Sequence, residues 1–174
     1  MSLLLISGGQ SGVDRAVLAF AVAQGIPYAG WCPAGGWAED LPDPPGVRAL
    51  FPGLRETRSA DPAERTRCNV AMATRVVTLW PDAASMARSP GTRLGEAHAA
   101  ALGRPAVAIR LDEDTAIAQL AALLAAGGRL AIGGPRESEA PGAEAGTRSA
   151  LVHAWALSQR TTTCQRTTTG LTTI

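Results

Sequence analysis

The stretch that decides the fold is Leu3-Leu4-Leu5-Ile6-Ser7-Gly8-Gly9-Gln10-Ser11-Gly12-Val13-Asp14, near the start of the chain. Its first residues are a short apolar run, which is typical of a buried strand. Its glycines predict a tight turn, and from residue 13 to 24 apolar side chains recur at helical spacing until Gly25 interrupts them. A strand, a glycine turn and a helix in this order indicate one unit of a parallel α/β sheet.

The rest of the chain repeats this alternation of apolar runs and helical patterns. Further strands are predicted over residues 26–31, 75–80, 106–111 and 129–132. Further helices are predicted over residues 62–73, 92–102, 115–126 and 146–159, the first of them preceded by a capping Asp61. A long loop rich in proline and glycine fills residues 32–54. The predicted fold class is therefore α/β, with a mostly parallel sheet.

The amino-acid composition excludes several classes of function. The chain has 174 residues, of which 46% are apolar and 4% aromatic, so one domain with an aliphatic core is expected. All 16 basic residues are arginines, and against 15 acidic residues they leave a net charge of +1. This balance argues against a nucleic-acid partner or an anionic membrane partner. The lack of lysine excludes a Walker-type phosphate loop and Schiff-base chemistry.

The chain divides into a ligand-binding domain over residues 1–159 and a threonine-rich C-terminal tail over residues 160–174, where Gln-Arg-Thr-Thr-Thr occurs twice. No apolar stretch reaches the roughly 18 residues that a membrane span needs. The short apolar start lacks the basic region of a signal peptide. The three cysteines are far apart, with no histidine at metal-ligand spacing. We therefore expect a reduced, cytoplasmic protein without a metal site.

Three glycine turns each follow a predicted strand and precede a predicted helix, at residues 7–12, 89–92 and 133–138. Such turns gather at the carboxyl edge of a parallel sheet, where ligands bind, and helix starts offer free N–H groups to anions. Thr92 is a candidate N-cap or phosphate ligand, and Arg136 is a candidate clamp for a phosphate or carboxylate. Chain reversal and capping explain each turn alone at least as well. Three such turns on one edge favour a phosphate-bearing ligand.

Several other polar residues have two interpretations each. Asp14, in a first helical turn, either complements the helix dipole or orients a ligand hydroxyl. Glu39 and Asp40 lie in the long loop, where acids are usually solvated. Arg65 and Asn69 are four residues apart on one predicted helix, which favours a surface pair.

The histidines and Cys32 have a simpler interpretation. His98 and His153 lie in alanine-rich helices without an obvious acid or nucleophile partner, so we interpret both as packing or surface residues. Cys32 follows a predicted strand end, and a buried thiol is the favoured interpretation.

Taken in order, the motifs resemble those of one known family. They are residues 6–15, Gly30-Trp31-Cys32-Pro33-Ala34-Gly35, Ala38-Glu39-Asp40, Arg65-Thr66 with Asn69-Val70, Gly91-Thr92 and Gly134-Pro135-Arg136-Glu137-Ser138. The chain is similar to the molybdenum carrier proteins, a branch of the Rossmann-like superfamily that includes the lysine-decarboxylase-like (LOG) phosphoribohydrolases. The resemblance covers about residues 5–159. It implies a Rossmann-like three-layer α/β/α domain, a homo-oligomer (dimer or tetramer), and a molybdopterin or nucleotide-like ligand over the glycine turns.

The residues that match the family's motifs are implied to bind this small phosphate-bearing ligand. They are Gly8, Gly9, Gln10, Ser11, Gly12, Asp14, Arg15, Glu39, Arg65, Asn69, Gly91, Thr92, Arg136, Glu137 and Ser138.

Two departures from the family pattern concern the second turn. The family commonly has Gly-Gly-Thr where this chain has Pro90-Gly91-Thr92. The phosphoribohydrolases carry Pro-Gly-Gly-x-Gly-Thr-x-x-Glu, whereas here the acid, Glu96, comes one residue later, about 100° further round the helix.

Two functions are therefore weighed. A carrier of molybdenum cofactor, or of a related pterin phosphate, needs N–H groups and arginine for the phosphate and polar groups for the ring, but no nucleophile. The alternative, cleavage of the N-glycosidic bond of a nucleoside monophosphate, needs an acid, for which Glu39, Asp14 or Glu96 would have to serve. The displaced Glu96 favours a carrier over an enzyme. A nucleotide sensor is a third interpretation.

Overall fold

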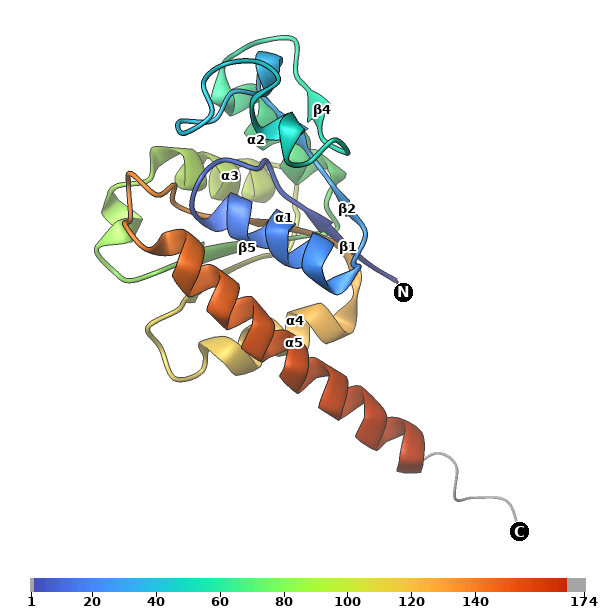
Figure 1. Cartoon of the computed structure of the whole chain (residues 1–174). Coiled ribbons are helices and arrows are strands. Elements are labelled where there is room, and N and C mark those ends of the chain that lie inside the picture. Colours follow the sequence, from blue (N-terminus) through green and yellow to red (C-terminus); the bar gives the residue numbers. More distant parts are fainter. Residues whose placement is uncertain (1, 169–174) are drawn as a thin grey trace.

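A parallel five-stranded sheet forms the centre of the computed structural model, which describes residues 2–168 and the side chains of residues 2–160 (Figure 1). The strands, in their order across the sheet, are β2 (Tyr28–Ala29), β1 (Leu3–Ile6), β7 (Gly128–Gly133), β5 (Arg75–Trp80) and β6 (Ala106–Arg110). All four pairings between neighbours are parallel. The predicted fold class is thereby confirmed.

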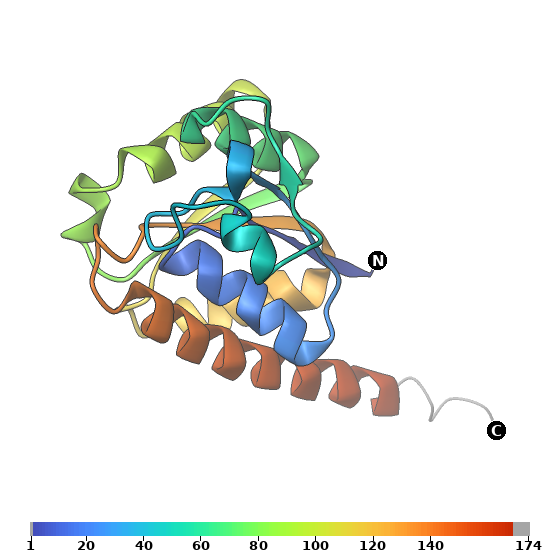
Figure 2. The same ribbon diagram turned by 45° about the horizontal axis from the view of Figure 1, so that its top comes forward.

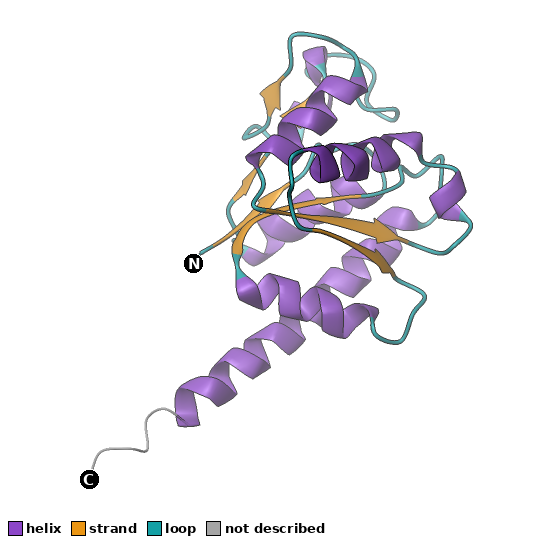
Figure 3. Cartoon of the chain, turned by 180° about the vertical axis from the view of Figure 1, so that it is seen from behind, coloured by secondary structure: helices purple, strands orange, loops and turns teal. Residues whose placement is uncertain are grey.

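Helices cover both faces of this sheet and complete three layers. On one face lie α1 (Val13–Gln24), α4 (Ala116–Ala126) and α5 (Ala143–Thr168), which pack against one another. On the other face lie α2 (Pro62–Met72) and α3 (Pro90–Ala101), which also pack together. The two helical layers are seen on opposite sides of the sheet in Figures 2 and 3. Among the described residues, no helix has the length and apolar character needed to cross a membrane.

The chain order creates a switch point at the centre of the sheet. From β1 the chain moves outward through α1 to β2, and from β5 it moves outward in the other direction through α3 to β6. The last strand, β7, is inserted between β1 and β5. In an open parallel sheet, ligands bind outside the carboxyl ends of the strands at such a reversal of strand order.

The larger core is aliphatic, as predicted, and lies between the sheet and the α1, α4 and α5 layer. It includes Leu5, Val17, Leu120 and Leu151, which are all fully buried. A smaller cluster on the other face packs β1, β5 and β7 against α2 and α3.

One predicted strand is divided in the structure. The strand expected over residues 26–31 is divided at Gly30, where a Cβ would collide with the carbonyl oxygen of Ser7. Its second half, β3 (Trp31–Cys32), pairs instead with β4 (Arg55–Glu56) in a separate two-stranded sheet. The long loop between these strands also contains two short 3-10 turns, Ala34–Gly36 and Gly46–Ala49.

The last helix is longer than predicted. α5 begins at Ala143 and continues to Thr168, so the expected end at residue 159 is wrong. Its C-terminal end projects beyond the sheet (Figure 1). The remainder of the predicted threonine-rich tail, residues 169–174, lies outside the described residues.

Leu151 provides a direct test of the larger core. We expect Leu151→Ala to lower the free energy of unfolding by about 2–5 kcal/mol, because it removes a fully buried side chain of α5 and leaves a cavity. The adjacent Val152 is 45% exposed, so Val152→Ala should change stability by at most about 0.5 kcal/mol. Urea unfolding of both variants checks this, and equal effects would contradict the packing described.

Candidate functional site

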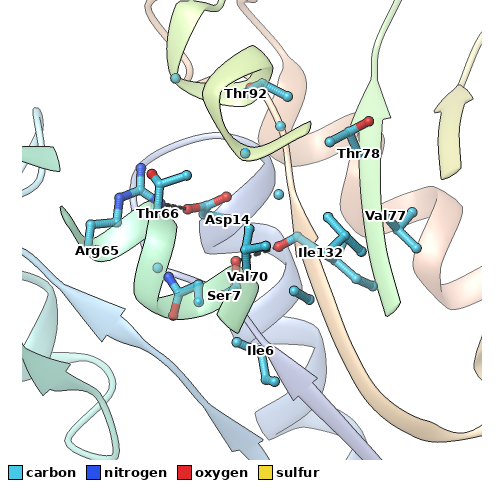
Figure 4. A pocket seen from close by; sticks show the side chains of 18 residues that line it. Ile6, Ser7, Asp14, Arg65, Thr66, Val70, Val77, Thr78, Thr92 and Ile132 are labelled. Atoms are coloured by element: carbon cyan, nitrogen blue, oxygen red, sulfur yellow. Dashed lines mark hydrogen bonds and ion pairs between the residues drawn. The ribbon is translucent and has the colours of Figure 1, made fainter. Parts of the chain in front are cut away.

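A pocket opens at the switch point, where β1, β7 and β5 end, and α2 and α3 cover it (Figure 4). Its cavity volume is about 70 Å³. Each predicted glycine turn contributes to its lining, with Gly8 from the first, Gly91 and Thr92 from the second, and Gly133 and Gly134 from the third. The chain therefore brings the three turns together at one small pocket.

An ion pair crosses the mouth of this pocket. Asp14, from the first turn of α1, is 4% exposed, and its Oδ2 accepts a 2.7 Å hydrogen bond from Nη1 of Arg65 on α2. The guanidinium of Arg65 lies against Gly8, where a Cβ would collide with it. A side chain at position 8 would therefore displace the guanidinium from its present place.

Asn69 does not pair with Arg65, so the expected surface pair is wrong. The side chain of Asn69 is directed to β3, where Oδ1 accepts from the Trp31 N–H at 2.7 Å and Nδ2 donates to the Trp31 carbonyl at 3.1 Å. Arg65 and Asn69 nevertheless both line the pocket. Spacing on a helix predicts which residues share a face, but it does not say that the face is turned to the sheet edge.

The helix that follows the second turn begins earlier than predicted. α3 begins at Pro90, so Thr92 lies inside the first turn and is not the N-cap. The Thr92 hydroxyl is 2.7 Å from the hydroxyl of Ser89. Gly91 and Thr92 border the pocket and belong to the first turn of α3. The backbone N–H groups of a first helical turn have no acceptor within the helix. Beside Gly91 the space is open, because a Cβ there would meet no atom within 4 Å.

The first and third turns are in direct contact beside the pocket. Gly12 lies against the backbone of residues 135–137, where any Cβ would collide. The Val13 N–H donates to the Pro135 carbonyl at 3.2 Å, and the Glu137 N–H donates to Ser11 Oγ at 3.1 Å. Gly12 is therefore required for the close approach of two backbones.

Glu39 connects these two turns to the long loop. Its carboxylate accepts hydrogen bonds from the Ser11 hydroxyl and from both the backbone N–H and the hydroxyl of Ser138. Arg136 Nη1 lies 3.7 Å from the same carboxylate, and its Nε lies 3.3 Å from Glu139. We call Ser11, Glu39, Arg136 and Ser138 the Glu39 network. Whether Arg136 also contacts a ligand phosphate stays a prediction.

Burial of Glu39 by itself would raise the pKa of its carboxyl group. The hydrogen bonds from Ser11 and Ser138 and the charge of Arg136 outweigh this effect, so the pKa lies below the ordinary value of a glutamate.

Gln10 and Arg15 connect the first turn to the long loop that contains Glu39 and Asp40. The Gln10 side-chain oxygen accepts from the Ser11 N–H at 3.0 Å and from the Glu39 N–H at 2.9 Å. Arg15 donates from Nε to the Gly9 carbonyl at 3.0 Å and from both terminal nitrogens to Asp40. The acids predicted to be solvated, Glu39 and Asp40, are thus both bound to other parts of the chain.

Glu96 lies beside the pocket and is hydrogen-bonded. Its Oε1 accepts from Thr78 Oγ1 at 2.7 Å, and Thr78 itself lines the pocket. Gly95, three residues after Thr92, also lines the pocket. The position where the phosphoribohydrolase motif carries its acid is therefore occupied by a residue without a side chain.

Cys32 is fully buried, as expected, and burial is the main cause that raises the pKa of its thiol. Among the described residues, no group of three or more histidines, cysteines or acids is arranged to hold a metal ion.

Three polar pocket residues, Ser7, Thr66 and Thr78, are absent from the set of binding residues predicted from the sequence. Thr78 lies within the apolar strand β5, and a lone polar residue in such a strand is a usable signal for a site. Ser7 was quoted only as part of the turn, yet it lines the pocket and its hydroxyl donates to the Ile132 carbonyl at 2.8 Å.

Comparison with known proteins places this site in a family. The model of the circularly permutated YpsA SLOG family matches residues 5–155, and the chain belongs to that family.

A solved structure supports the same placement. A crystal structure from Syntrophus aciditrophicus, described as a "putative molybdenum carrier protein", is 30% identical with a TM-score of 0.73. The match covers 88% of this chain and 94% of that one. Among curated proteins, none matches the chain.

The Glu39 network should contribute stability that depends on pH. Because the pKa of Glu39 is lower in the folded state than its ordinary value of 4.5, this stability is present above that value and is lost as the pH falls through the folded-state pKa. We expect Glu39→Gln to lower the free energy of unfolding at pH 7 and to have a smaller effect at pH 3.

Urea unfolding at the two pH values checks this prediction. The control is Glu113→Gln, since the side chain of Glu113 is 47% exposed and should show little effect at either pH. A Glu39→Gln effect that is the same at both pH values would contradict a lowered pKa.

Proposed function

We propose that the chain is a carrier that binds the phosphate end of a small molecule, of the molybdopterin or nucleotide type, in the pocket between Gly8, Arg65 and the start of α3. Membership of the SLOG family and the likeness to a protein described as a molybdenum carrier support this proposal. The observation that carries it is the convergence of a cation, three glycine turns and a helix start on one small pocket.

The size of the pocket indicates which part of the ligand enters. A cavity of about 70 Å³ has room for a few water-sized groups, which is the scale of one phosphate. Pockets that enclose a whole drug-sized molecule are larger, roughly 300–1,000 Å³. The residues present therefore fit the phosphate of molybdopterin or of a nucleotide, whose ring would lie outside this cavity. When bound, molybdopterin would supply the ligands of a molybdenum centre.

Arg65 is the residue best placed to bind the phosphate. A guanidinium has five N–H donors, and the Asp14 carboxylate accepts from Nη1. Within residues 2–160 no other hydrogen bond to this guanidinium is found, so its remaining donors can meet an anion with the planar geometry that suits a phosphate. Asp14 holds the guanidinium in place beside Gly8, so the cation is oriented before the ligand arrives.

None of the three acids considered for the hydrolase alternative is unpaired. Asp14 lines the pocket, but its carboxylate pairs with Arg65 at 2.7 Å. Glu39 accepts three hydrogen bonds within its network, and Glu96 accepts one from Thr78. Gly95 stands where the phosphoribohydrolase motif has its acid. These observations favour binding without turnover.

A binding measurement with Arg65→Gln tests the role of this residue. We expect the variant to bind adenosine monophosphate or inorganic phosphate about 10- to 150-fold more weakly than the unaltered chain, because it loses a charge-assisted hydrogen bond worth about 1.5–3 kcal/mol. Arg67→Gln, on the exposed side of the same helix, is the matched control and should bind normally. Isothermal calorimetry measures both, and equal affinities would remove Arg65 from the site.

A turnover assay separates the carrier from the hydrolase. Purified chain incubated with several nucleoside monophosphates should release no free base, as measured by chromatography, and should retain molybdopterin added to it. Release of base that disappears in Glu96→Gln or Glu39→Gln, while binding is kept, would overturn the carrier proposal in favour of the hydrolase.

A further inference from the structure

The sheet ends on one side in a strand with an unpaired edge. β6 is last in the strand order, and its only strand partner in the described chain is β5. The Val76 N–H donates to the Pro105 carbonyl, and the Leu111 N–H donates to the Trp80 carbonyl. Residues 105 and 111 therefore direct their backbone groups to β5. Because this direction alternates along a strand, residues 106, 108 and 110 direct theirs away from the sheet.

The outer edge of β6 is accessible. Ala106 and Ala108 are both exposed, and within residues 2–168 no backbone hydrogen bond reaches their outward N–H and carbonyl groups. No helix passes in front of this side of the sheet in the view from behind (Figure 3). The middle of the strand, Ala-Val-Ala, has no charged residue or proline to protect a free edge from pairing. Pro105, which directly precedes the strand, directs its carbonyl to β5.

The two ends of this edge carry opposite charges. At the amino end, Arg104 forms no ion pair with a described residue. Its Nη2 donates to the Ala71 carbonyl at 3.4 Å, and its buried Nε has no hydrogen-bond partner among the described residues. At the carboxyl end, three consecutive acids at residues 112–114 are faced by Arg110, which pairs with Asp112 at 2.7 Å and with Glu113 at 3.3 Å. The edge is therefore positive at its start and negative at its end, which is self-complementary in an antiparallel arrangement.

We propose that β6 pairs with β6 of a second copy of the chain, antiparallel, about a twofold axis at Ala108. In this register Ala108 faces Ala108, Ala106 faces Arg110, and Arg104 faces Asp112 of the other copy. Ala106, Ala108 and Arg110 direct their backbone groups outward, as hydrogen-bonded pairs require. The Arg110 carbonyl already accepts from the Glu113 N–H at 3.2 Å, so it would use its second lone pair for the other copy. An axis one residue earlier, at Val107, would instead place Arg104 opposite Arg110.

The resulting dimer has one continuous sheet with two open pockets. Joining two five-stranded sheets at β6 gives ten strands, and the antiparallel pairing turns the carboxyl edges of the two copies in opposite directions. Each pocket lies at the carboxyl edge of its own copy, so neither is covered. The proposed dimer does not depend on the proposed ligand, so a test that rejects one of the two proposals leaves the other unaffected.

Charge reversal tests the register. Sedimentation equilibrium of the full chain should show a dimer, and Arg104→Glu or Asp112→Arg should each raise its dissociation constant about tenfold or more. The double variant Arg104→Glu/Asp112→Arg should restore dimerisation, because the two charges are exchanged. Circular dichroism confirms that the variants are folded. A monomer for the unaltered chain, or single variants that dimerise normally, would overturn the proposal.

Cross-linking tests the axis in a chain whose Cys68 and Cys164 are replaced by serine. In a hydrogen-bonded antiparallel pair the Cα atoms are about 5.5 Å apart, within the range of about 4.4–6.8 Å for a disulfide. Ala108→Cys should therefore give a covalent dimer on mild oxidation. The control is Ala106→Cys, equally exposed, whose two copies would be about 13 Å apart along the strands. Cross-linking of the control alone, or of both equally, would overturn the axis at Ala108.

Discussion

An ion pair at the carboxyl edge of the sheet joins the two helical layers. Asp14 comes from α1 on one face and Arg65 from α2 on the other, and their side chains are only 6% and 17% exposed. Removing one partner of a fully buried pair costs about 3–5 kcal/mol, because an uncompensated charge remains. The cost is smaller here, since Arg65 keeps some contact with solvent. The guanidinium of this pair lies in the space that a side chain at position 8 would enter.

The turns around the pocket are held by contacts among themselves. Gly12 allows the first turn to touch the third, and Glu39 binds both turns to the long loop through Ser11 and Ser138. Many residues that match the family's motifs therefore support the wall of the pocket and do not line it. A preformed wall suits a carrier, because less ordering has to accompany binding.

Much of the fold was predictable because its signals are local. Apolar runs and helical periodicity located the central strands and most helices, and Asp61 caps α2 as its position before Pro62 indicated. Local signals were insufficient where a distant contact decides the outcome. The strand predicted over residues 26–31 is divided because Trp31 and Cys32 pair with residues 55 and 56, which are distant in the chain. Thr92 lies inside α3, which begins two residues earlier than predicted.

The sequence by itself determined the alternation of strands and helices, the aliphatic core, the reliance on arginine for positive charge and the glycine turns after the strands. These features depend on residue type and short-range spacing. Only the tertiary structure decided which polar residues meet. Arg65 pairs with Asp14, 51 residues away in the chain, while its helix neighbour Asn69 binds the backbone of Trp31. Helical spacing defines a face, but the order of strands in the sheet determines what that face contacts.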